Sequence, residues 1–157
     1  MLRLTCFWTA ITLVMGACAA PPPQVQPADE ATVAAVARFS EEVDRRVREK
    51  DLDGFAALWM DDLTLLNPDQ PAVVGKRAVE EVYRAMFAAL DYAGQHHPGE
   101  TYGIGELIIH QGVVTGTMTP TAGGPSMQLD NKYMWLLRRQ GDGSLRAWRV
   151  MLNTNAP

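Results

Sequence analysis

His110 and Tyr133 are the two residues of this chain whose types could together carry out proton transfer. An imidazole can take a proton near neutral pH, and a phenol can donate a hydrogen bond to an oxygen that gains charge during a reaction. Both residues fall in stretches with the alternating pattern of strands, so both could reach a pocket. His110 also precedes Gln111-Gly112, a pair that predicts a turn, and an exposed histidine at a strand end is the alternative interpretation.

A long strand predicted at 127–139 places Asn131, Tyr133 and Trp135 on one face. Polar side chains on such an apolar face must find hydrogen-bond partners inside the fold or at the mouth of a pocket. We therefore expect Asn131 and Tyr133 in a ligand pocket. A tyrosine held by a structural partner, and aromatic side chains that only fill the core, are the alternatives. The expected pocket walls are Trp59, Tyr83, Phe87 and Trp135.

Other groups of polar residues have less suitable spacing for chemistry. His96-His97 lies near Glu100 in a predicted Pro-Gly loop, but successive strand residues point to opposite faces, so no metal is expected. Asp61-Asp62 resembles paired catalytic carboxylates only superficially, because successive residues at a helix end point apart. The sequence contains no nucleophile elbow, phosphate-binding loop or dinucleotide fingerprint, and no cofactor is expected.

The N-terminal residues 1–17 predict export through a signal peptide. A charged tip ending at Arg3 is followed by an apolar stretch and then by Met15-Gly16-Ala17-Cys18. The stretch is shorter than the roughly 20 apolar residues of a spanning helix and is interrupted by threonines. Its Gly-Ala-Cys ending resembles a bacterial lipobox, which implies that Cys18 is acylated and becomes the first mature residue. Ordinary cleavage near Ala20, with loss of Cys18, is the alternative.

Residues 18–28 form a proline-rich linker that predicts an extended spacer. Together with the lipobox, it favours attachment to a membrane through a lipid anchor. Ala19 stands where an aspartate would resemble the signal for retention in the inner membrane. In a Gram-negative cell, the resemblance therefore implies an outer-membrane lipoprotein that faces the periplasm.

Composition limits the chemistry of the remaining segment, 29–157, which has the length of one ordinary domain. The only cysteines are Cys6 and Cys18, so the domain holds no thiol, and disulfides and cysteine catalysis are excluded. The net charge is -4 and the basic residues form no stripe with interleaved aromatics, which disfavours nucleic-acid partners. The densest charge run, 41–50, alternates in sign and predicts a solvated helix face.

The order of periodic segments predicts an α+β domain, with three N-terminal helices packed on one face of an antiparallel sheet. Helices are expected from Asp29 to about Lys50, from Leu52 to Asp61-Asp62, and from about Val79 to Gly94. Strands are expected at 63–66, 72–74, 102–110, 113–119, 127–139 and 145–153, with turns at Gln111-Gly112, 123–125 and 141–143.

The outer face of the predicted sheet is also partly apolar. Met134 and Leu136 lie on the second face of the long strand, and the last strand carries apolar side chains on both faces. A symmetric dimer that packs sheet against sheet would cover them, so we expect a homodimer.

Several motifs resemble the nuclear transport factor 2-like superfamily. In the front half these are Lys50-Asp51-Leu52-Asp53-Gly54, then Leu63 to Pro68, then Gly75-Lys76-Arg77 opening a helix. In the back half, Asp130 to Trp135 and the Gly141-Asp142-Gly143-Ser144 hairpin resemble the SnoaL-like branch. The resemblance, over about 32–155, implies a cone in which a strongly curved sheet wraps helices around one pocket, often in a dimer. Members include isomerases, cyclases, dehydratases, ligand binders and assembly modules.

Two positions argue against the activity of ketosteroid isomerase, a member of this superfamily. Its general-base aspartate, which precedes a proline, matches Asn67 here, and an amide cannot take a proton from carbon at neutral pH. Its oxyanion tyrosine matches Val43, which has no donor. Asn67 could still hydrogen-bond a ligand, or it could serve only as a turn residue before Pro68.

These observations favour a membrane-anchored periplasmic lipoprotein whose cone binds a small apolar or amphipathic molecule without converting it. A cofactor-free enzyme of the isomerase, cyclase or dehydratase type is the alternative, with His110 and Tyr133 as its only assembled base and donor. A dimeric scaffold with a filled cone is the third possibility.

Overall fold

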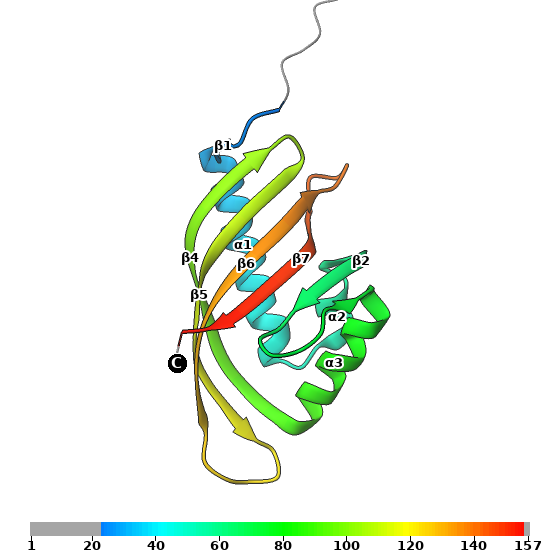
Figure 1. Ribbon diagram of the computed structural model, residues 1–157, viewed down its shortest axis with the longest axis vertical. Coiled ribbons are helices and arrows are strands. Elements are labelled where there is room, and N and C mark those ends of the chain that lie inside the picture. Colours follow the sequence, from blue (N-terminus) through cyan, green and yellow to red (C-terminus); the bar gives the residue numbers. More distant parts are fainter. Residues whose placement is uncertain (1–22, 156–157) are drawn as a thin grey trace, which may run out of the picture.

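A computed structural model describes residues 23–155, in which a long twisted sheet curves around three helices (Figure 1). The predicted signal peptide and Cys18 lie outside these residues. In chain order the elements are β1 (Gln26–Pro27), α1 (Glu30–Arg48), α2 (Leu52–Ala56), β2 (Trp59–Leu66), β3 (Val73–Val74), α3 (Lys76–Ala89), β4 (Leu90–Ile104), β5 (Leu107–Pro120), β6 (Met127–Arg139) and β7 (Leu145–Thr154). The strands lie in the order β1-β4-β5-β6-β7-β2-β3. The predicted α+β class, with helices packed on a curved sheet, is confirmed.

The helix α1 begins and ends where the sequence predicts. The Asp29 side chain accepts a hydrogen bond from the backbone N–H of Thr32 at 2.8 Å, which is the expected N-cap. Residues three and four apart are buried on the face that packs against β4, and two of them are polar, Ser40 and Asp44. The prediction that the whole charge run 41–50 is solvated is therefore wrong at Asp44.

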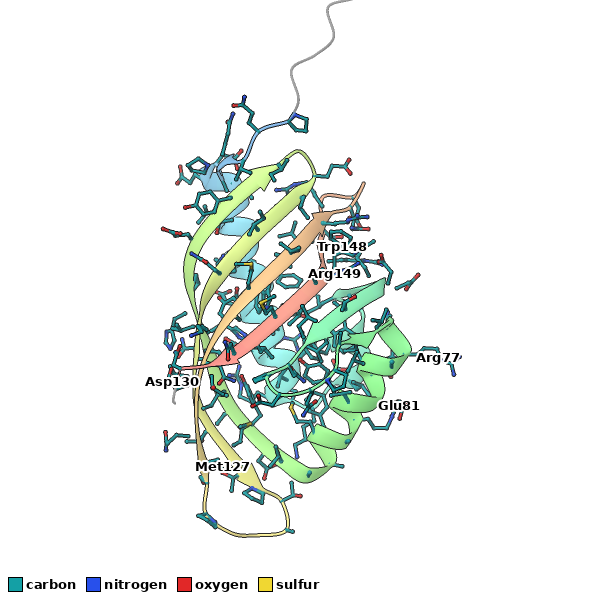
Figure 2. All side chains as sticks on the ribbon, in the orientation of Figure 1. Arg77, Glu81, Met127, Asp130, Trp148 and Arg149 are labelled. Atoms are coloured by element: carbon teal, nitrogen blue, oxygen red, sulfur yellow. The ribbon has the colours of Figure 1, made fainter. Side chains whose placement is uncertain are left out.

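The second helix is shorter than predicted, because β2 begins at Trp59. Asp61-Asp62 thus lies within a strand and not at a helix end, and both carboxylates are exposed. Strand structure is favoured here because Trp59, Leu63 and Leu65 bury their side chains against the helices while β2 pairs with β7. Figure 2 labels Trp148 on β7, whose indole N–H donates to Asp62 at 2.9 Å.

The strands β4 and β5 differ most from the predictions. The third helix was predicted to reach Gly94, but it ends at Ala89, and the expected loop around His96-His97 is part of β4. The chain turns at Gly105, whose positive φ of 59° suits a tight turn, and not at Gln111-Gly112. Gly112 instead permits close packing inside the sheet, since an added Cβ would lie 2.6 Å from the Tyr133 hydroxyl.

The sheet is mixed, although the predicted meander of β4 to β7 is antiparallel throughout. The exception is β2, which pairs with β7 in parallel. A parallel pair needs a long crossover connection, and here most of the domain lies between the two strands.

The two faces of β6 divide as predicted. Leu129, Tyr133, Trp135 and Leu137 are buried on the helix-facing side, and Met134 is 38% exposed on the other. The side chains of the inner face point into the space between sheet and helices (Figure 2). Among residues 23–155, none of the helices has the length and apolar character needed to cross a membrane.

Candidate functional site

A cavity of about 160 Å³ lies between the helices and the inner face of the sheet. Most of its walls are apolar side chains from α1, α2, α3, β2 and the strands β4 to β7. The predicted pocket residues Trp59, Tyr83, Asn131 and Trp135 are among them. Besides the two tryptophans, the lining residues with polar side-chain atoms are Tyr83, Tyr92, His96 and Asn131.

His96 is bound twice by the carboxylate of Asp44 on α1. One carboxylate oxygen lies 2.5 Å from the ring Nδ1, and the other accepts a hydrogen bond from the His96 backbone N–H at 3.0 Å. Both side chains are nearly buried, with 8% of His96 and 12% of Asp44 exposed. Because one carboxylate holds both the backbone and the ring, it fixes the position of the imidazole.

The second ring nitrogen of His96 is the free one. Within residues 23–155 no hydrogen-bond partner is found for Nε2. In the same part of the chain, every fully buried side-chain nitrogen or oxygen has a hydrogen-bond partner. Nε2 therefore retains accessible surface, and His96 belongs to the cavity wall. With Nδ1–H donated to Asp44, a neutral ring carries its lone pair on Nε2, at the cavity.

Two aromatic side chains of β6 pack against the His96 ring. Its centroid lies 4.9 Å from that of Tyr133, at an interplanar angle of 78°, and 4.8 Å from that of Trp135. Trp135 also makes an edge contact with Phe39 at 5.5 Å. These contacts leave the imidazole little freedom to rotate, so its Nε2 points in a fixed direction.

Two phenols provide hydrogen-bond donors at the cavity. Burial raises the pKa of Tyr83 to about 12, and burial followed by the nearby Asp44 charge raises the pKa of Tyr92 as well. Both hydroxyls therefore keep their protons at neutral pH. The end of the Tyr92 ring lies over Gly94, where an added Cβ would overlap it, and this brings the hydroxyl toward His96 along β4.

Asn131 lines the cavity two strands away from His96, on the same face of the sheet. The strand register places His96, Val114 and Asn131 in one row over β4, β5 and β6. Strands two apart are separated by roughly 10 Å. The half-buried amide of Asn131 has no side-chain hydrogen bond within the described part of the chain, so it is available to a ligand.

The predicted pair of His110 and Tyr133 does come together, but outside the cavity lining. His110 Nε2 lies 3.0 Å from the Tyr133 hydroxyl, and Nδ1 lies 3.0 Å from Thr101 Oγ1. Both ring nitrogens are thus occupied, and the residue is 1% exposed. Burial lowers the pKa of His110, so the ring is neutral in the folded protein.

Other predicted residues also lie away from the cavity lining. Phe87 packs behind Tyr83, with ring centroids 6.1 Å apart. Asn67 follows the end of β2 and is half-buried beside Pro68. Tyr133 is instead among the residues that line a shallow groove together with Gly112, Met134 and Met151.

The sequence analysis missed Asp44, and with it the role of His96. One signal was present: Val36, Ser40 and Asp44 follow at four-residue spacing on the buried face of the first helix. A carboxylate at such a position needs a partner inside the fold. His97, the neighbour of His96, points to the opposite face and binds Thr115 Oγ1 at 2.8 Å.

Comparison with known proteins agrees with this architecture. A family model described as a SnoaL-like domain matches residues 30–148. No curated protein matches the chain.

Solved structures show the same fold at low sequence identity. A ketosteroid isomerase-like protein from Erwinia carotovora atroseptica SCRI1043 is 22% identical with a TM-score of 0.73, covering 82% of this chain and 100% of that one. A conserved protein from Planctomyces limnophilus DSM 3776 is 17% identical with a TM-score of 0.74, covering 80% and 98%. A protein from Streptomyces avermitilis, named as a candidate dehydratase from the NTF2-like family, is 15% identical with a TM-score of 0.70, covering 82% and 100%.

Proposed function

The chain belongs to the SnoaL-like domain family, and we propose that it is a cofactor-free enzyme that moves a proton on a small, largely apolar molecule. His96 is the general base, Asp44 positions it, and the phenol of Tyr92 donates a hydrogen bond to the oxygen that gains charge. Asn131 orients the molecule from two strands away on the same face of the sheet. This proposal favours the enzyme alternative over simple binding.

The observation that carries the proposal is the Asp44–His96 pair at the wall of an apolar cavity. A nearly buried carboxylate is costly unless it is paired. Here the pair leaves one imidazole nitrogen unpartnered, whereas a purely structural histidine such as His110 has both nitrogens occupied. A fixed base beside a water-poor cavity is the arrangement that proton abstraction from carbon requires.

The reaction class follows from the groups that meet there. A base next to a hydrogen-bond donor favours removal of a proton beside a carbonyl, because the donor stabilises the enolate oxygen. Return of the proton at another carbon gives isomerisation, and loss of a leaving group gives dehydration. The names of the structural neighbours include both an isomerase-like protein and a candidate dehydratase, which is support by analogy.

Deuterium exchange tests the proposal without knowledge of the natural substrate. The full chain, purified in detergent, is mixed in deuterium oxide with one-ring and two-ring ketones, here cyclohexanone, 4-hydroxycyclohexanone and 2-tetralone. NMR then follows the loss of the protons beside the carbonyl. We expect acceleration over buffer that is lost in His96→Ala and kept in His97→Ala, the matched control on the other face of β4. No acceleration with any ketone would refute the enzyme.

Binding without conversion is the second candidate, and the predominantly apolar lining favours it. In that case His96, Tyr92 and Asn131 only orient a ligand. Ligand binding measured by calorimetry would then persist while exchange is absent.

We also propose that the protein is a lipoprotein of the outer membrane facing the periplasm, anchored through Cys18. The support is the Gly16-Ala17-Cys18 sequence and the proline-rich linker after it. Cys18→Ala should move the protein from the membrane fraction to the soluble fraction, and wild type should carry the mass of acyl chains. Soluble wild type without that added mass would contradict the anchor.

A further inference from the structure

The size of the cavity restricts the molecule that His96 can reach. An engineered protein cavity of about 150 Å³ with apolar walls binds benzene. The cavity here has a similar volume, about 160 Å³, which favours a molecule with one six-membered ring and small substituents over fused rings.

The walls on the helix side cannot easily move apart to admit a larger molecule. Phe55, Trp59 and Tyr83 form a closed aromatic group, with ring centroids 4.7 to 5.5 Å apart. Trp59 and Phe55 are also almost completely buried. Because protein interiors are close-packed, displacing these rings would disturb the core behind them. This part of the wall is thus fixed by the packing of the core.

The polar groups lie at two separate positions on the sheet wall of this space. His96 and Tyr92 belong to β4, while Asn131 belongs to β6, and the apolar Val114 of β5 lies between them. A ring with one oxygen substituent can form a hydrogen bond at only one of these two positions. A ring with oxygen substituents on opposite carbons can reach both, and this avoids leaving a polar group unpaired next to the bound ligand.

We infer that the substrate is a single six-membered ring with oxygen substituents on opposite carbons, such as a 4-hydroxycyclohexanone, and that a 1,4-dihydroxybenzene binds in the same way as an analogue that has no proton beside a carbonyl. The statement that this molecule is a substrate rests on the proposed function of the same site. The ring size and the two oxygens rest on the cavity volume and on the placement of Asn131.

Binding measurements with four probes test the inference on the full chain in detergent. The probes are hydroquinone, phenol, benzene and 2,6-dihydroxynaphthalene, and calorimetry measures their affinities. We expect hydroquinone to bind at least tenfold more tightly than phenol, and the naphthalene to bind at least tenfold more weakly than hydroquinone. Asn131→Leu should remove the preference for hydroquinone over phenol, and His97→Ala should leave it unchanged.

A second variant tests the size limit directly. Met118 lines the cavity from β5, and Met118→Ala should enlarge it enough for the dihydroxynaphthalene to bind. Tight binding of the naphthalene to wild type, or equal affinities for phenol and hydroquinone, would overturn the inference.

The deuterium-exchange assay separates this inference from the proposed function. If only the two-ring ketone is exchanged, the protein is an enzyme and the inferred substrate class is wrong. If hydroquinone shows the expected affinity pattern and no ketone is exchanged, the ligand class stands and the enzyme proposal fails.

Discussion

Replacing Asp44 with asparagine should inactivate the site while the fold persists, because the change acts on the tautomer of His96. In wild type one oxygen of Asp44 accepts from the backbone N–H of His96 and the other from its ring Nδ1–H. In Asp44→Asn the single amide oxygen is needed for the backbone N–H. The amide NH₂ group then faces Nδ1 and can only donate to it. His96 must move its proton to Nε2, where it no longer can accept one from a substrate.

The change of tautomer sets the expected loss of activity, and the changed hydrogen bonds set the expected loss of stability. The corresponding change in a Ser-His-Asp triad, where the imidazole is also left in the wrong tautomer, lowers kcat by about 10⁴-fold. We therefore expect deuterium exchange in Asp44→Asn to fall by about 10³ to 10⁴-fold. Two hydrogen bonds remain, one of them with its direction reversed, but neither has a charged partner, and a charged partner strengthens such a bond by about 1 kcal/mol. The free energy of unfolding should thus decrease by about 1–2 kcal/mol, since relief from burying a charge offsets part of the loss.

Two measurements check this reasoning. Nitrogen-15 NMR of the imidazole should show the proton of His96 on Nδ1 in wild type and on Nε2 in Asp44→Asn. Asp61→Asn is the matched control, because the Asp61 carboxylate is exposed and away from the cavity lining. A variant with the Nε2 tautomer that keeps more than a tenth of the wild-type exchange rate would refute His96 as the base.

Three further predictions concern stability and assembly. Burial lowers the pKa of His110 below its usual 6.5, so the unfolded chain binds the proton more tightly than the folded protein does. The free energy of unfolding therefore has its highest value above about pH 6.5, and it decreases as the pH falls toward the pKa of the folded state. Urea unfolding at pH 7.5 and pH 5 should show this loss, and a smaller one in His110→Gln; equal losses would exclude His110 as the source. Gly112→Ala should destabilise the domain by about 1–3 kcal/mol through overlap with neighbouring atoms, whereas Gly141→Ala, with open space around it, should not. Light scattering should show a dimer that Met134→Glu with Met151→Glu converts to a monomer, since the two methionines pair on the outer face; a monomeric wild type at tens of micromolar would contradict the dimer.

The parts of the fold that the sequence predicts are those decided by contacts within one element. The cap at Asp29 and the apolar spacing after it determine the first helix. The alternation along 127–139 likewise determines which side chains of β6 are buried. In both cases the pattern is set by the side chains of the segment itself, so no knowledge of the partner is needed.

The candidate site could not be predicted in the same way, because its central contact joins residues far apart. Asp44 and His96 are 52 residues apart in sequence, and nothing near either one indicates the other. Pro98 and the nearby glycines also favoured a loop, yet β4 is nearly at the sheet edge, where a strand tolerates proline. Periodicity assigns a residue to a face of its own element, but the element that covers that face depends on the tertiary fold.

The contrast between two inner-face histidines is the strongest internal argument for the site. His110 and His96 lie on neighbouring strands and both contact Tyr133 and Trp135. His110 has hydroxyl partners at both ring nitrogens, so its hydrogen bonds are complete without a ligand. His96 has a carboxylate at one nitrogen and the cavity at the other. The carboxylate fixes the orientation of the imidazole, and the open side gives its second nitrogen access to a molecule. The same residue type therefore supports the sheet at one position and supplies a reactive nitrogen at the other, and the difference is set by what each ring nitrogen faces.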